Sequence, residues 1–461
     1  MKMLRDPQCL LADELAQLRQ QFQVPDSFPP TVLAAAEVAA RRQPSEHADW
    51  LDRTFVTLDP AGSTDLDQAF AIEAAGADWL LHYAIADVGW FVTHDDPLDR
   101  EAWARGVTTY LPDGKAGLYP PALAEGAASL LSDGPRPAVV FTVRVRPDGV
   151  AALDGVTRAV IRSRAKLAYE TVREADLPPG FAEVAARVGA AELRRAAARV
   201  DPPEQEVDRD ALGRFELRLR PLLPSETHNA ALSLACNLAV ADLLLAHRTG
   251  LFRVMAGPDA WAEARLRQTA RAFGLIWPDQ ATLAQFERQL DPRDPRHGAF
   301  MLAVRRAGQG ASYAPYAAEQ LPWHAAIAAP YAHATAPLRR LADRYVIEAA
   351  LALANGRPVP EQISAAFGRL PTTMQRAEAR AGQVERAVVD LAEVALLAGR
   401  EGEVFEAVVT DLGEAGARIQ LCAAPVVART AANEVVPGDR IRVRLEAADP
   451  ARRLLRFARI G

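Results

Sequence analysis

The sequence predicts an α+β protein, because strand-like and helix-like segments occupy separate parts of the chain. Between about Trp50 and Arg162, short segments rich in β-branched and aromatic residues alternate with Gly, Pro and Asp, which is typical of strands and turns. After Arg162, apolar residues follow helical spacing as far as about residue 400, and residues 401–461 return to a strand-like pattern. We therefore expect a helical module at residues 1–48, a mixed central domain at 49–400 and a small β-barrel at 401–461.

The N-terminal module is predicted to hold two short helices. Leu11, Leu15, Leu18 and Phe22 would line one face of the first helix. Pro29 and Pro30 then interrupt the chain, and a second helix capped by Thr31 would run to about residue 42. Two such helices fit a small helix-turn-helix-like module, and they fit equally well a structural arm packed on the main body.

The central domain divides into predicted strands and later predicted helices. The strands are expected at residues 55–58, 69–72, 79–85 and 139–145. The helices are expected at residues 182–200, 230–247, 260–273, 338–355 and 372–399. The segment 230–245 is nearly free of charge, but Asn237 and Asp242 interrupt it, so it is expected to be a buried helix and no membrane span.

The C-terminal residues predict a five-stranded barrel of the OB type. Its strands are expected at residues 404–410, 417–421, 426–428, 440–445 and 454–460. Along the fourth strand, Arg440, Arg442 and Arg444 alternate with aliphatic residues, so three guanidinium groups would project from one face. Such a face suits a phosphate backbone, and it equally suits a solvated edge strand that is protected by charge.

Composition narrows the class of protein. Of 461 residues, half are apolar and 24% are charged, as in an ordinary globular protein. The net charge of −6 argues against a protein that coats nucleic acid non-specifically. The basic residues are nearly all arginine, and lysine occurs only at Lys2, Lys115 and Lys166. The first residues lack the apolar stretch of a signal peptide, so we expect a cytoplasmic protein. We also expect a monomer without a membrane partner.

The cysteines support neither a disulfide nor a zinc site. Cys9, Cys236 and Cys422 lie far apart and form no Cys-x-x-Cys or Cys/His spacing. We expect three buried or half-buried thiols and no disulfide-linked partner.

An acidic turn is the most informative stretch of the chain. Asp59 ends a predicted strand, and Asp65 and Asp67 follow two residues apart, so their carboxylates should face the same side. If the turn folds back, Asp59 joins them, and the mutual repulsion of three carboxylates calls for a hard divalent cation. Taken alone, an acidic turn is more often a solvated loop. The spacing fits neither an EF-hand loop nor a phosphatase-type Asp-x-Asp motif.

Four segments together resemble a known family. The stretch from Leu58 to Ala69 resembles the acidic signature Asp-(five residues)-Asp-x-Asp-Asp of the ribonuclease II/R (RNB) family. Three later segments follow in the family's order. They resemble its His-x-x-Ile-Ala-Asp-Val, Arg-Gly-x-Ser-x-Tyr-Leu-Pro and His-x-Thr-Ser-Pro-[Ile/Leu]-Arg-[Lys/Arg] motifs at residues 82–88, 105–112 and 333–340. The resemblance covers roughly residues 50–461 and implies a C-terminal OB-fold domain that binds RNA.

The resemblance also implies roles for particular residues. Asp59, Asp65 and Asp67 would hold Mg²⁺, for which Mn²⁺ can substitute, and Asp67, Gln68 and Arg339 would be catalytic. Tyr110 would stack on the terminal base, and Glu385 would hold the 3′-terminal nucleotide, although an ordinary helical Glu paired with an arginine fits Glu385 equally well. RNA-binding roles are also expected for Arg340 and for the three arginines of the barrel.

The sequence departs from the family pattern at several positions. Gln68 stands where the family has a fourth aspartate; it can hydrogen-bond a metal-bound water but adds no charge. Ala336 replaces a serine, Leu341 replaces an aromatic residue, and a short helical module stands where two cold-shock-type OB folds are usual. Without the fourth aspartate, a second metal ion would be held more weakly. The short N-terminal module would leave the RNA entry more open.

Near the last motif, a helix beginning at Thr335 would present its N-terminus to phosphate. Arg339 or Arg340, in its first turn, could then clamp the scissile phosphate. Spacing alone does not choose between the two arginines, and the family match favours Arg339. The alternative role for Arg339 is an i,i+4 ion pair with Asp343.

We therefore expect a magnesium-dependent exoribonuclease that degrades single-stranded RNA processively from the 3′ end to nucleoside 5′-monophosphates. The main alternative is an RNA-binding protein on the same fold that has lost catalysis, with Gln68 as its mark. A second alternative is an unrelated metal-dependent phosphohydrolase that acts on small molecules.

Overall fold

The strand-rich part of the sequence folds into a six-stranded sheet in the order β1-β8-β2-β3-β4-β7. Its strands are β1 (Ala48–Asp49), β2 (Phe55–Asp59), β3 (Gln68–Ala75), β4 (Asp78–Ala86), β7 (Pro135–Val145) and β8 (Ala151–Ala168). The long strand β8 pairs antiparallel with β7 as far as Arg162 and parallel with β2 from Ser163 onward. The sheet therefore closes on itself, and β2 is one strand of the ring β8-β2-β3-β4-β7.

The four predicted strands of this region all form, and β2 ends at Asp59 as expected. β8, which is the longest strand of the body, was not predicted from the sequence. The reason is its composition: Arg158, Arg162, Arg164 and Lys166 dilute the apolar pattern, although buried and more exposed positions still alternate along its second half.

A buried helix, α6 (Pro224–Ala246), packs against β8, β7 and β4 and against α10 (Leu341–Ala354). α6 is long and apolar enough to cross a membrane, but 61% of its most apolar window is buried within the protein, as in many core helices. Its position agrees with the expectation of a buried helix. Other helices of the body are α3 (Val88–Phe91), α4 (Pro97–Arg105), the π-turn η1 (Leu123–Ala127), the 3₁₀ turn η2 (Glu174–Asp176) and α5 (Phe181–Arg194).

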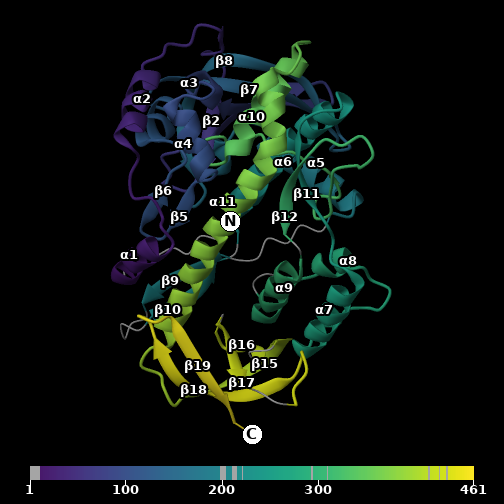
Figure 1. Cartoon of the computed structure of the whole chain (residues 1–461). Helices are drawn as coiled ribbons and strands as arrows, with labels where there is room; N and C mark the ends of the chain where they lie inside the picture. The colour runs from purple at the N-terminus through teal and green to yellow at the C-terminus, as the bar shows by residue number, and fades with distance from the viewer. Residues whose placement is uncertain are drawn as a thin grey trace.

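One long helix, α11 (Glu361–Leu397), runs from the body toward the barrel (Figure 1). The sequence predicts the start of this helix at residue 372, and a proline inside a helix removes one backbone hydrogen bond. The helix nevertheless continues through Pro371. Buried residues on both sides of the proline, including Leu370 and Met374, fix this stretch against the core, and that packing outweighs the local preference.

The two N-terminal helices, α1 (Ala12–Gln21) and α2 (Pro30–Ala40), pack on different parts of the body. Leu11, Leu15 and Leu18 of the α1 region share a buried cluster with the C-terminal half of α11, as their spacing predicted. α2 contacts α4 and η1 instead. This packing corresponds to an arm on the main body. Thr31 lies inside α2, and Pro29 occupies the N-cap position with no side-chain cap.

Smaller elements complete the body. They are the hairpin β5 (Thr109–Leu111) and β6 (Gly114–Ala116), the hairpin β9 (Glu204–Arg209) and β10 (Phe215–Arg220), and the sheet of β11 (Leu251–Met255), β12 (Ala311–Pro315), β13 (Trp323–His324) and β14 (Ala329–Pro330). A separate helical cluster consists of α7 (Ala260–Ala272), α8 (Leu283–Glu287) and α9 (Pro295–Ala307).

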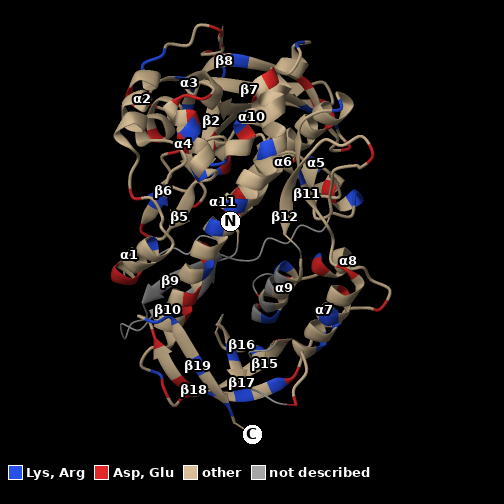
Figure 2. Cartoon of the chain, in the orientation of Figure 1, with Lys and Arg blue, Asp and Glu red and all other residues tan. Residues whose placement is uncertain are grey.

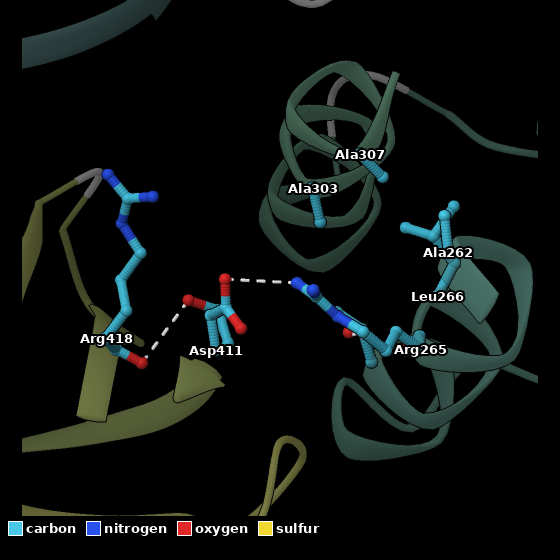
Figure 3. A pocket seen from close by; sticks show the side chains of 9 residues that line it. Ala262, Arg265, Leu266, Ala303, Ala307, Asp411 and Arg418 are labelled. Carbon is cyan, nitrogen blue, oxygen red and sulfur yellow. Dashed lines mark hydrogen bonds and ion pairs between the residues drawn. The ribbon is translucent and has the colours of Figure 1, made fainter. Parts of the chain in front are cut away.

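The C-terminal strands form a closed five-stranded barrel in the order β15-β16-β17-β19-β18, which confirms the predicted barrel. They are β15 (Val404–Gly413), β16 (Gly416–Leu421), β17 (Val427–Ala431), β18 (Arg440–Asp449) and β19 (Leu454–Arg459). A small cavity lies between the barrel and the helices α7 and α9. Arg265 and Asp411 form an ion pair of 3.1 Å at its edge, and Figure 3 shows how the two side chains face each other.

The cysteine expectation holds only in part. Cys236 is fully buried in α6, but Cys422 is exposed after β16, where the chain turns away from the barrel core. Cys9 lies outside the described residues. Those residues are 11–197, 204–209, 215–220, 222–291, 294–308, 310–413, 416–424, 426–431 and 434–460.

Candidate active site

The acidic turn joins the end of β2 to the start of β3. Asp59 is the last residue of β2, and Asp65 and Asp67 lie in the irregular segment just before β3. Ser129 anchors this segment: its hydroxyl donates to the carbonyl of Thr64, and it accepts from the amide of Leu66 at 2.9 Å. The turn is therefore pinned to the body and is not a loose solvated loop.

Asp67 links the acidic turn to the arginine motif. One carboxylate oxygen accepts from the amide of Leu338 at 2.7 Å, and the other accepts from Nε of Arg339 at 3.1 Å. The two partners lie more than 270 residues away in the chain. Asp67 is almost fully buried, and this burial raises its pKa to about 7 despite the opposing effect of Arg339.

Asp59 lies within electrostatic range of the same arginine. Burial raises the pKa of Asp59 to about 6; Arg339 and Lys166 lower it, and Asp65 raises it further. Lys166, on β8, is held nearby because its Nζ donates to the carbonyl of Ala61 at 3.0 Å. Asp59 therefore interacts electrostatically with Asp65 and with Arg339, and the predicted convergence of all three carboxylates stays a prediction.

Asp65 faces the β5–β6 hairpin. Nζ of Lys115 lies 2.7 Å from one of its carboxylate oxygens, and the hydroxyl of Tyr110 donates to the other at 3.2 Å. Lys115 also pairs with Glu125 at 3.1 Å. The structure therefore places Tyr110 beside the carboxylates. Its proposed stacking on the terminal base remains a prediction.

The segment from Thr335 to Arg340 is a turn, and the helix α10 begins only at Leu341. Our prediction of a helix from residue 338, capped by Thr335, was wrong. Arg340 is in an extended conformation and bridges to Val107, which keeps these residues out of the helix. The side chain of Asp343 serves the turn instead, because it accepts from the amides of Thr335 and Ala336.

The two arginines of the motif have different partners. Arg340 pairs with the fully buried Asp343, through Nε at 3.0 Å and through Nη2 at 2.8 Å. The alternative pair that we considered, Arg339 with Asp343, does not form. Arg339 uses only its Nε, toward Asp67, and its side chain remains 39% exposed. Its terminal nitrogens make no hydrogen bond within the described ranges and can reach a ligand.

Gln68 occupies the first position of β3 and is hydrogen-bonded to the protein through both ends of its amide group. Its Nε2 donates to the carbonyl of Thr335 at 2.7 Å, and its Oε1 accepts from the buried hydroxyl of Tyr83. Gln68 therefore joins β3 to the arginine turn. The expected contact with a metal-bound water remains a prediction.

Asp59, Asp65 and Asp67 offer hard oxygen donors of the kind that Mg²⁺ takes. Among the described residues, no three acidic, His or Cys side chains converge closely enough to enclose a metal ion by themselves. Mg²⁺ does not require such a cage, because it keeps several waters and binds through one or two carboxylates together with phosphate oxygens. Buried carboxylates whose pKa is raised gain stabilisation from a nearby cation, so the donor set fits Mg²⁺ as an open site.

The remaining predicted residues lie apart from this cluster. Glu385 is half-buried on α11 and makes no ion pair with a described side chain. Arg440, Arg442 and Arg444 are exposed on β18, whereas Ile441, Val443 and Leu445 point into the barrel. The alternation is therefore as predicted, and binding of RNA by this face remains a prediction.

Reasoning from the sequence missed Lys115, Lys166 and Asp343, which contact or surround the predicted site. The rarity of lysine in this chain was a signal for the two lysines. Of the three lysines in this arginine-rich chain, two lie beside the acidic turn. Asp343 was considered, but only as a partner of Arg339.

Two family models match the chain. An RNB domain matches residues 48–177, and an RNase II-type exonuclease C-terminal S1 domain matches residues 403–460. The first match contains the complete acidic turn, and the second coincides with the barrel. The chain thus resembles RNB-family exonucleases in both of these segments.

Relatives in the RNB family extend the likeness over most of the chain. Ribonuclease R 1 of Lactococcus lactis is 24% identical over 88% of this chain and 53% of its own length. The chain spans about half to three fifths of the length of the first curated relatives it matches.

Solved structures share the RNB fold. Mycoplasma genitalium RNase R in complex with ribose-methylated single-stranded RNA superposes with a TM-score of 0.83 at 18% identity, covering 97% of this chain and 77% of that one. Yeast Ssd1, described as a pseudonuclease, gives a TM-score of 0.66 at 16% identity, covering 98% of this chain and 58% of that one.

Proposed function

We propose that the chain is a 3′→5′ exoribonuclease that hydrolyses single-stranded RNA processively to nucleoside 5′-monophosphates, with Mg²⁺ or in its place Mn²⁺. One observation carries the proposal above all: the contact of Asp67 with Leu338 and Arg339 joins the acidic turn to the arginine turn in one site. The matches to the RNB domain and to the RNase II-type S1 domain, and relatives named ribonuclease R, support it.

The residues of the site have distinct roles in this proposal. Asp59, Asp65 and Asp67 would hold magnesium, which supplies positive charge for phosphoryl transfer and lowers the pKa of a water. Arg339, fixed through Nε, presents its terminal nitrogens to the oxygens of the scissile phosphate. Lys115 and Tyr110 orient Asp65, and Gln68 fixes the arginine turn against β3.

The competing proposal is an RNA-binding protein of this fold without catalysis. Two observations favour it: Gln68 replaces a carboxylate, and its amide group is already bonded on both sides. Yeast Ssd1, which is described as a pseudonuclease, also has this fold. We prefer the enzyme, because the other three carboxylates and Arg339 are present and a site with two metals can survive the change of one ligand.

The two proposals differ in one assay. Purified protein is incubated with a 3′-tailed RNA and Mg²⁺, beside an EDTA control, the Asp67→Asn variant and the matched control Asp26→Asn, which changes an exposed aspartate. The enzyme predicts shortening of the RNA by the wild type and by Asp26→Asn. Asp67→Asn should lose more than about 100-fold of the rate while it keeps RNA affinity.

Other results would reject the enzyme. RNA binding without shortening in every sample would support the inactive protein. Inertness toward RNA, together with hydrolysis of small phosphate esters, would support a phosphohydrolase instead.

A further inference from the structure

A second basic site lies between α4 and α11, apart from the carboxylates. A cavity of about 360 Å³ opens there, which is within the ~300–1,000 Å³ that ligand pockets usually have. We call it the α4–α11 cavity. It is lined by Trp103, Ala104, Thr373, Arg376, Ala377 and Arg380.

Positive charge dominates the rim of this cavity. Arg376 and Arg380 lie one turn apart on the same face of α11. Arg369, two turns before Arg376, stacks its guanidinium over the ring of Trp103 at 4.5 Å from the centroid. None of the three arginines forms an ion pair with an acidic side chain in the part of the chain that the structure describes, although the chain as a whole carries a net charge of −6.

The neighbouring arginines of the same region are neutralised. Arg105 pairs with Glu101 at 2.8 Å, and Arg344 pairs with the buried Asp99. Arg376 and Arg380, which line the cavity, are not neutralised in this way by a described acidic side chain. Such a cluster is repulsive unless an anion binds to it.

The aromatic wall of the cavity is held rigidly. Nε1 of Trp103 donates to the hydroxyl of Tyr345 at 2.7 Å, and Tyr345 is itself bonded to Asp99 at 3.2 Å. The ring of Trp103 therefore has a fixed orientation before any ligand arrives, which reduces the entropy lost on binding.

The floor depends on the close approach of the two helices. Gly106, the C-cap of α4, has a φ of 72°, and a Cβ at this position would lie 2.5 Å from Cβ of Ala377. The same approach lets Nη2 of Arg380 donate to the carbonyl of Arg105 at 3.3 Å, which fixes Arg380 at the cavity while its other nitrogens stay available.

We propose that the α4–α11 cavity binds a nucleotide, with Arg376 and Arg380 on a phosphate group and Trp103 against the base or sugar. Guanidinium groups are suited to phosphate, and an aromatic ring tolerates any base. The nucleotide could belong to an RNA strand running over the outside of the body, or be a free nucleoside monophosphate. The proposal goes beyond hydrolysis and does not require it.

The test compares four proteins in EDTA, so that RNA stays intact. They are the wild type, the pair Arg376→Gln with Arg380→Gln, the charge-keeping pair Arg376→Lys with Arg380→Lys, and the control Arg41→Gln, which changes an exposed arginine at the end of α2. Thermal unfolding of all four checks that the fold is retained.

The first arm measures binding of adenosine 5′-monophosphate and of inorganic phosphate by calorimetry. If the cavity binds free nucleotides, the glutamine pair loses one adenosine monophosphate site, which Arg41→Gln and the wild type keep. Phosphate alone should bind the same site more weakly, because Trp103 then contributes nothing.

The second arm measures affinity for labelled polyuridine between about 50 and 200 mM salt. If RNA occupies the cavity, the slope of log K against log salt becomes shallower by about 1.4 in the glutamine pair, at about 0.7 for each lost phosphate contact. The lysine pair should keep the wild-type slope, because the slope reports charge.

The proposal is overturned if the glutamine pair matches Arg41→Gln in both arms, or if the lysine pair loses binding as fully as the glutamine pair. A wild-type slope near zero would instead reject RNA binding by the chain altogether. That result counts against the proposed function and leaves the first arm to decide on the cavity.

Discussion

At the scale of single residues, the two buried aspartates at the arginine turn, Asp343 and Asp67, have different hydrogen-bond partners. Asp343 accepts from two backbone amides and from two nitrogens of Arg340, so its hydrogen-bonding capacity is largely used within the protein. Asp67 accepts from one amide and one guanidinium nitrogen, and it faces Arg339, which remains partly exposed. We infer that Asp343 shapes the turn and that Asp67 serves the chemistry.

Replacement of Asp343 tests this division. Asp343→Asn removes the charge opposite the half-buried Arg340, and we expect a loss of about 3 kcal/mol in the free energy of unfolding. Catalytic activity should fall as well, because the turn positions Arg339. Urea unfolding measures the first effect. Asp113→Asn, which breaks the more exposed pair with Arg19, is the control and should cost at most about 1 kcal/mol. Equal unfolding curves for the two variants would refute the structural role.

Gln68 offers a second test at this scale. Gln68→Ala leaves the carbonyl of Thr335 and the buried hydroxyl of Tyr83 without their partner, and each unpaired group costs about 1–3 kcal/mol. We expect a lower unfolding temperature than for Gln43→Ala, which changes an exposed glutamine. If Gln68 acted only by holding a water, the stability of the metal-free protein would not change.

At the scale of elements, the site depends on short irregular segments fixed by regular ones. The acidic turn extends from the end of β2, the arginine turn precedes α10, and the β5–β6 hairpin supplies Lys115 and Tyr110. Each segment is pinned by side-chain contacts to its neighbours, which is how loops become rigid enough for chemistry. The α7–α9 cluster instead contains an unsatisfied group, Glu287 at the end of α8.

Glu287 should make stability depend on pH. Neither carboxyl oxygen has a hydrogen-bond partner in the described part of the protein, and burial raises its pKa to about 8 from the ordinary 4.5. Between these values the folded protein keeps a proton that the unfolded chain releases. Stability therefore falls as the pH rises through this interval, by up to about 1.4 kcal/mol per pH unit.

Substitution isolates the effect. Glu287→Gln should unfold at a higher temperature than the wild type near pH 8, and the difference should shrink toward pH 5. The exposed Glu37→Gln on α2 is the control. Parallel pH profiles for the wild type and Glu287→Gln would contradict the prediction.

At the scale of the whole molecule, a chain with a net charge of −6 still exposes basic surfaces. Basic residues are spread over both the body and the barrel (Figure 2). On β18, Arg440, Arg442 and Arg444 lie on the outer face, where no ion pair holds them within the described ranges. An acidic protein can thus still present basic surfaces to a polyanion.

The barrel arginines should contribute to RNA affinity through charge alone. We expect the triple change of Arg440, Arg442 and Arg444 to glutamine to weaken polyuridine binding at low salt. The slope of log K against log salt should become shallower by up to about 2. Cleavage of a short oligonucleotide that cannot reach the barrel should be unaffected. An unchanged slope would mean that this face is only a solvated edge.

The sequence by itself determined the fold class, four strands of the main sheet, the barrel with its alternating arginines, and the residues of the acidic turn. These features depend on spacing along a continuous stretch of chain, and local spacing dictates which side chains share a face. The elements missed or misplaced include β8, the hairpins β5–β6 and β9–β10, the β11–β14 sheet, the start of α10 and the extent of α11. For β8, α10 and α11, contacts with distant segments outweighed the local preference.

Only the tertiary structure decided which arginine faces Asp67, that Lys115 neutralises Asp65, and that Gln68 bonds to the carbonyl of Thr335. Each of these contacts joins segments from 50 to more than 260 residues apart in the chain. No local pattern encodes such a pairing, because it arises only after the closed sheet, α6 and α10 have packed around a shared core.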